Sequence, residues 1–265
     1  MVSGISAAML LDRDRKSCGY GWLISKDRKG VYVMTTSDVL HRIKHDEDDQ
    51  YEKLHFFIES CNDKEPTPCS IIKTEKKFVI VSSKKGSVLD YVVLRFKTSS
   101  KVASEKPLNV SKQCPEPLET VGVPYSSLGC PNKSFCQRSI VLQYPEDLIN
   151  WLIKVGSRSS FHSVAKRAPS PGCDPTIDWK KARDLREVLI PYWKTDHNAN
   201  ECFSGLPLFT FQDSQVVGMC SRRVFITEEI KENHFINFGI RIDQIIADID
   251  SKNPRVARSL FPDYF

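Results

Sequence analysis

The chain has 265 residues, a length that fits one large domain or two small ones. Hydrophobic residues make up 40% and charged residues 27%, which is ordinary for a globular protein and excludes a disordered, collagen-like or coiled-coil chain. The net charge of +5 permits acidic or nucleic-acid partners but does not by itself argue for them.

The apolar or alternating runs along the chain are short, rich in Val, Ile, Phe and Tyr, and separated by turn or charged residues. This pattern predicts many short strands in a sandwich or in barrels. The predicted strands are residues 5–11, 20–25, 31–36, 54–59, 78–82, 91–96, 139–143, 206–211, 215–219 and 235–238.

Helical periodicity is scarce, and its clearest case is residues 241–251. Isoleucines recur there with the i, i+3, i+4, i+7 spacing of one buried helix face, at Ile242, Ile245, Ile246 and Ile249. Pro254 lies just past the expected end of this helix. Residues 146–155, which follow Pro145, are a second candidate helix.

Two polar stretches divide the chain. Ser, Lys and Pro are dense over residues 99–117, which predicts a domain boundary, and residues 156–181 are expected to form an exposed loop. The sequence therefore predicts an all-β fold of two packed barrels. The expected division is an N-terminal barrel over residues 1–112, a C-terminal barrel over 113–238, and a helix and tail over 239–265.

The nine cysteines are an odd number spread over the whole chain, which favours free thiols over a disulfide framework. The N-terminal apolar run is too short for a secretory signal, and no stretch reaches the roughly 18–20 apolar residues of a membrane span. We therefore expect an intracellular protein, nuclear or cytoplasmic, with no membrane segment. No Cys-x-x-Cys pair occurs, and we expect no metal site.

Four segments, taken in order, resemble the trypsin-like serine peptidases. They are GYGWLISKDRKGVYVMTTSDVL (19–40), LDYVVLRFK (89–97), ECFSGLPLF (201–209) and QVVGM (215–219). The resemblance implies two six-stranded antiparallel barrels and no cofactor. It also implies Ser204 at the nucleophile position, Asp90 at the triad aspartate, and an oxyanion hole formed by the backbone N–H groups of Cys202 and Ser204.

A closer resemblance is to the nuclear trypsin-like peptidases called "family with sequence similarity one-eleven". It is carried by LDYVVLRFK and ECFSGLPLF together with VGVPYSSLGC (121–130) and NFGIRIDQIIADID (237–250). This resemblance covers about residues 18–262 and implies work on proteins bound to chromatin.

The chain departs from the trypsin-like pattern at two chemically important positions. Asp38 stands where the family has the general-base histidine, and a carboxylate, with an ordinary pKa of about 4, is a poor base for a serine hydroxyl at neutral pH. Cys202 replaces a glycine of the oxyanion loop. The sequence therefore favours a catalytically impaired peptidase homologue that binds proteins or peptides.

Two alternatives remain open from the sequence. The first is an active serine endopeptidase that uses Ser204 with a base from elsewhere, such as His41 or His45. The second is a nucleic-acid-associated adaptor that uses the basic residues 166–186, although such charges more often form a solvated face.

Overall fold

The computed structural model describes just over half of the chain in separate stretches, and the account below concerns these residues. They are 7–11, 17–28, 30–37, 39, 55–58, 67–70, 79–84, 87–96, 106–126, 134–141, 185–194, 204–225 and 235–265. The predicted helix at 146–155 and the polar segment 156–181 lie outside them, and so do residues 166–184 of the basic stretch 166–186.

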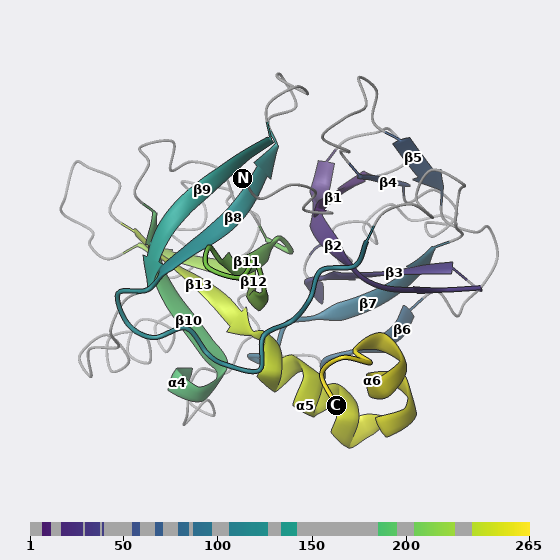
Figure 1. Cartoon of the computed structure of the whole chain (residues 1–265). Coiled ribbons are helices and arrows are strands. Elements are labelled where there is room, and N and C mark those ends of the chain that lie inside the picture. The colour runs from purple at the N-terminus through teal and green to yellow at the C-terminus, as the bar shows by residue number, and fades with distance from the viewer. Residues whose placement is uncertain are drawn as a thin grey trace, which may run out of the picture.

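Two β units lie side by side with the C-terminal helices below them (Figure 1). The first is a seven-stranded antiparallel sheet of order β5-β4-β1-β2-β3-β7-β6, and the second is a closed barrel of order β10-β13-β12-β11-β8-β9. The sheet contains β1 (Ala7–Leu11), β2 (Ser17–Asp27), β3 (Gly30–Thr35), β4 (His55–Ile58), β5 (Thr67–Ser70), β6 (Val79–Ser82) and β7 (Val92–Phe96). The barrel contains β8 (Thr120–Ser126), β9 (Ser134–Val141), β10 (Leu189–Lys194), β11 (Pro207–Thr210), β12 (Val216–Phe225) and β13 (Phe235–Arg241).

The all-β fold class predicted from the sequence is confirmed, and so is the six-stranded C-terminal barrel. The N-terminal unit has seven strands, one more than predicted, because β5 extends the sheet beyond β4. Each of the predicted strands overlaps an observed one, whereas β5, β8 and β10 were not predicted. The expected division at residues 112 and 238 remains a prediction.

Two apolar cores support the two units. One fills the interior of the barrel and includes Val121, Val123, Ile190, Leu206 and Leu208. The other is shared between the sheet, the barrel and the C-terminal helices. Its members come from distant parts of the sequence and include Trp22, Met34, Tyr91, Val216, Phe238, Ile240 and Ile245. Because this core belongs to both units, it fixes how the sheet and the barrel sit against each other.

Residues 106–119 cross from the sheet to the barrel within the stretch predicted as a boundary. The backbone N–H of Leu108 donates to the Leu23 carbonyl at 3.3 Å, on β2. Farther along, the N–H of Ser111 donates to the Val216 carbonyl at 2.8 Å, on β12. The segment is thus hydrogen-bonded to both units rather than forming a loose linker.

The predicted C-terminal helix is confirmed as α5 (Ile242–Lys252), and its four isoleucines are buried. A second helix, α6 (Pro254–Leu260), follows after the single residue Asn253. Pro254 therefore stands just past the end of one helix and in the first turn of the next, where its missing N–H costs nothing. The Asn253 side chain accepts a hydrogen bond from the Val256 N–H at 3.2 Å and caps α6. A third helix, α4 (Leu185–Val188), is one turn before β10.

Leu118 is 79% exposed and has a φ of 70°, a backbone conformation that a Cβ disfavours by about 1–2 kcal/mol. Replacing Leu118 by glycine should therefore raise the free energy of unfolding by about 0.5–1 kcal/mol, after the entropy that glycine loses on folding is subtracted. Urea unfolding followed by circular dichroism measures this gain. Leu118→Ala keeps the Cβ and is the matched control. A gain of equal size in both variants would contradict the assignment of strain to this backbone conformation.

Candidate active site

The candidate site is built where the end of β3 meets the turn that carries Ser204. Thr35 is the last residue of β3, and Thr36 follows it; both are fully buried. The Thr35 hydroxyl donates to the Tyr20 carbonyl of β2 at 2.6 Å, which ties this end of β3 to the neighbouring strand. The chain that leaves β3 is thereby held at a defined place beside the barrel.

The Ser204 turn is held between β2 of the sheet and β12 of the barrel. The Tyr20 N–H donates to the Ser204 carbonyl at 3.1 Å, and the Gly205 N–H donates to the Cys220 carbonyl at 2.8 Å. Gly205 has a φ of +93°, and a Cβ on it would lie 1.8 Å from the Tyr20 carbonyl oxygen. The turn therefore requires glycine at this position, both for its conformation and for the close approach of β2.

The Ser204 side chain makes a hydroxyl–hydroxyl hydrogen bond with Thr36. The two oxygen atoms lie 2.9 Å apart, and Ser204 is only 3% exposed. In such a pair one hydroxyl donates and the other accepts. A threonine hydroxyl is neutral near pH 7, so this bond satisfies the buried Ser204 oxygen without providing a group that can take up its proton.

Asp90 precedes β7 and is mostly buried. Its carboxylate accepts a hydrogen bond from the backbone N–H of Ser37 at 2.9 Å. Thr36 and Ser37 are consecutive, so neighbouring residues of one segment hold Ser204 and Asp90. Ser204 and Asp90, which are 114 positions apart in the sequence (204 − 90) and were assigned to one site, are thus each hydrogen-bonded to one of two consecutive residues.

The remaining predicted site residues, Asp38 and Cys202, lie outside the described residues, as do the alternative bases His41 and His45. The roles of these residues, and the oxyanion hole, remain predictions. Asp38 directly follows Ser37 in the sequence. The predicted base position is therefore the next residue after Thr36 and Ser37, which contact Ser204 and Asp90.

Thr36 is a site residue that the sequence analysis missed. In a run of buried β residues, a threonine fits as an ordinary strand former, and nothing in its spacing marks it as a partner of Ser204. The available signal was its position two residues before the predicted base, in the segment that the trypsin-like resemblance places in the cleft.

Two classes of site find no support within the described residues. No group of three or more His, Cys, Asp or Glu side chains there could hold a metal ion. No helix there is long and apolar enough to cross a membrane.

Comparison with solved structures finds the same architecture in trypsin-like serine proteases. Kallikrein-related peptidase 10 is 13% identical, with a TM-score of 0.53 over 93% of this chain and 94% of that one. Neuropsin, a serine protease expressed in the limbic system of mouse brain, is 12% identical, with a TM-score of 0.51 over 94% of this chain and 95% of that one. No protein-family model matches the sequence, and no curated protein matches it. At this identity the likeness establishes the trypsin-like fold.

Proposed function

We propose that this chain is a trypsin-like serine peptidase homologue that has lost proteolytic activity and acts by binding proteins or peptides. The observation that carries the proposal is the buried hydrogen bond between the Ser204 and Thr36 hydroxyls. A serine nucleophile needs a partner that accepts its proton, and a neutral hydroxyl does not do this. The sequence supports the same conclusion, because Asp38 stands at the position of the general-base histidine.

The proposed partners are proteins or peptides because of the fold that this chain shares with trypsin-like proteases. Trypsin-like proteases bind polypeptides, and the proposal that this chain also binds them is an analogy from its fold. The resemblance to the nuclear "family with sequence similarity one-eleven" peptidases is the basis for proposing chromatin-associated proteins as partners. The nine cysteines are the basis for proposing an intracellular location, nuclear or cytoplasmic.

A fluorophosphonate probe, which reacts with activated serines, tests the loss of catalysis. We expect the full chain to be labelled at least about 10³-fold more slowly than trypsin, because removal of one triad member has an effect of this order. The Ser204→Ala variant should give the same background signal as the parent. Rapid labelling of the parent that disappears in Ser204→Ala would refute the proposal.

The binding part of the proposal is tested on the same preparation. Peptides selected by display on the folded chain should be recovered intact after prolonged incubation, as judged by mass spectrometry, while trypsin added to a parallel sample cleaves them. Failure to select any peptide would count against a binding role. Cleaved products that are absent with Ser204→Ala would indicate an enzyme.

A second candidate function is an active serine endopeptidase. It is favoured by one observation, which is that Ser204 and Asp90 are both present and are held by the consecutive residues Thr36 and Ser37. In that case His41→Ala or His45→Ala should abolish the labelling of Ser204. The nucleic-acid adaptor depends on residues 166–186, and a mobility-shift assay at low salt tests it directly.

A further inference from the structure

Asp90 and Tyr91 are neighbours in the chain, but their side chains serve opposite sides of it. The Asp90 carboxylate accepts from the Ser37 N–H, in the candidate site. The Tyr91 ring is fully buried in the core shared by the sheet, the barrel and the C-terminal helices. This burial, and then the carboxylate of Asp248, raise the pKa of Tyr91 far above its ordinary value, so its hydroxyl remains a donor.

The Tyr91 hydroxyl donates to the Asp248 carboxylate of α5 at 2.5 Å. The same carboxylate oxygen lies 2.6 Å from the Lys252 ammonium, which also donates to the Ser82 carbonyl of β6 at 3.0 Å. Lys252 Nζ lies 5.5 Å from the centroid of the Tyr91 ring, within the range of a cation–π contact. We refer to Tyr91, Asp248 and Lys252 as the α5 clasp, because together they join the last long helix to β6 and to the start of β7.

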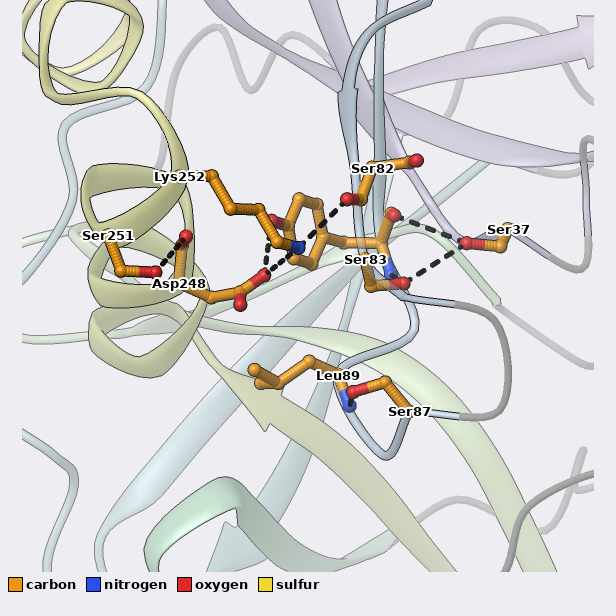
Figure 2. A network of polar contacts seen from close by, with 9 residues as sticks. Ser37, Ser82, Ser83, Ser87, Leu89, Asp248, Ser251 and Lys252 are labelled. Atoms are coloured by element: carbon orange, nitrogen blue, oxygen red, sulfur yellow. Dashed lines mark hydrogen bonds and ion pairs between the residues drawn. The ribbon is translucent and has the colours of Figure 1, made fainter.

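The backbone of Tyr91 continues this network into the candidate site. Its carbonyl accepts from the Ser83 N–H at 2.9 Å and from the Ser37 hydroxyl at 3.2 Å, and its N–H donates to the Ser83 hydroxyl at 3.3 Å. Figure 2 shows Ser37 on one side and the α5 side chains of Asp248 and Lys252 on the other, with Ser82 and Ser83 between them. Ser37 is therefore bonded to both Tyr91 and Asp90, and it directly follows Thr36, the partner of Ser204.

We propose that Tyr91 is a positioning residue, through which the α5 clasp holds Asp90 and Ser37 in place beside Ser204. The alignment of the site then depends on helix α5, which is more than 150 residues away from Asp90 and Ser37 in the sequence. A hydroxyl–carboxylate bond of 2.5 Å is short and charge-assisted, which makes it one of the stronger contacts available to a tyrosine. The surface ion pair of Asp248 with Lys252 alone would contribute little, because both side chains are partly exposed.

The chain offers a matched control for this proposal. Tyr32 is also a nearly buried tyrosine of the same sheet, and its hydroxyl donates to the Asp27 carboxylate at 2.8 Å. That bond spans only five residues and stays between β2 and β3. Tyr32→Phe and Tyr91→Phe therefore remove the same chemical group from the same sheet, but only the second loses a contact with α5.

Hydrogen–deuterium exchange on the full chain tests the proposal. The Ser37 amide, which donates to Asp90, should exchange roughly tenfold faster in Tyr91→Phe, the factor expected for losing one bond to a charged group. Tyr32→Phe should leave this amide unchanged. Unchanged exchange at Ser37 in Tyr91→Phe, or an equal increase in both variants, would overturn the proposal.

A second pair of variants keeps the test decisive if Tyr91→Phe alters the core. Asp248→Asn retains an oxygen that can accept from Tyr91, whereas Asp248→Ala does not. Exchange at Ser37 should be faster in Asp248→Ala than in Asp248→Asn, and equal rates would contradict the role of the hydroxyl bond. The exchange measurement requires no reaction at Ser204, so this proposal and the proposed function can fail independently.

Discussion

Replacement of Gly205 by alanine is expected to lower the free energy of unfolding by roughly 3–5 kcal/mol. Two costs add in this variant. The backbone has a φ of +93°, which an L-residue with a side chain rarely adopts. The new methyl group would also lie 1.8 Å from the Tyr20 carbonyl oxygen and 2.8 Å from the Thr35 hydroxyl, so β2 or the Ser204 turn would have to move.

Gly205→Ala should disturb the candidate site itself as well as lower the stability of the whole domain. Tyr20 donates to the Ser204 carbonyl and accepts from Thr35, so a displaced β2 would break the bonds that align β3 with the Ser204 turn. Because a domain of this size is typically stable by only about 5–15 kcal/mol, such a loss removes a large share of the total.

Denaturant unfolding monitored by tryptophan fluorescence measures the effect, and Gly239→Ala is the matched control. A methyl group on Gly239 would first meet the terminal methyl of Leu208 at 3.1 Å, and a side-chain tip can yield where a carbonyl cannot. We expect this control to change stability by less than about 1 kcal/mol. If Gly205→Ala were as mild as the control, the close approach of β2 to the Ser204 turn would be wrong.

Local patterns in the sequence predicted the elements whose residues follow one period. Helix α5 is the clearest example, because its four isoleucines repeat every three or four residues and all four are buried. The predicted end of that helix near Pro254 was also correct. Helix α6 was not predicted, because Pro254 marks the end of α5 in the sequence and at the same time is the first residue of α6.

The three strands that were not predicted each contain a proline, at Pro68 in β5, Pro124 in β8 and Pro191 in β10. A proline cannot donate to a ladder, which argues against a central strand when only the sequence is known. Among the described residues, each proline lies where its strand is paired on one side only. Strand β5 is at the end of the sheet order, the pairing of β8 with β11 ends at Gly122 of β8, and the pairing of β10 with β9 begins at Tyr192.

The contacts that define the candidate site come from long-range packing, which local patterns do not encode. The Thr36–Ser204 bond spans 168 residues, and the Tyr91–Asp248 bond spans 157. The trypsin-like resemblance led to Ser204 and Asp90, because family motifs carry positions that share a role. It did not lead to Thr36 or to Asp248, whose contribution depends on the three-dimensional partner each one meets.

A variant that reverses the proposed losses should gain reactivity at Ser204. The triple substitution Thr36→Ala, Asp38→His and Cys202→Gly removes the neutral hydroxyl partner, supplies an imidazole at the base position and restores the glycine of the oxyanion loop. We expect fluorophosphonate labelling at least about 10²-fold faster than in the parent, because a positioned general base alone contributes a factor of this order. Rate measurements at equal protein concentration give the comparison.

The component variants separate the causes. With Thr36 retained, the imidazole must compete with a hydroxyl that already holds the Ser204 oxygen at 2.9 Å, so the gain should be smaller. Adding Asp90→Asn should remove most of the gain, because a carboxylate beside the imidazole orients it and favours its charged form.

Labelling of the triple variant should rise with pH through a titration at or above the ordinary histidine pKa of about 6.5, since the neutral imidazole is the base and a neighbouring carboxylate raises its pKa. A folded triple variant that stays at the labelling rate of the parent would show that Asp38 does not occupy the base position and that the Thr36 hydroxyl is not what keeps Ser204 unreactive.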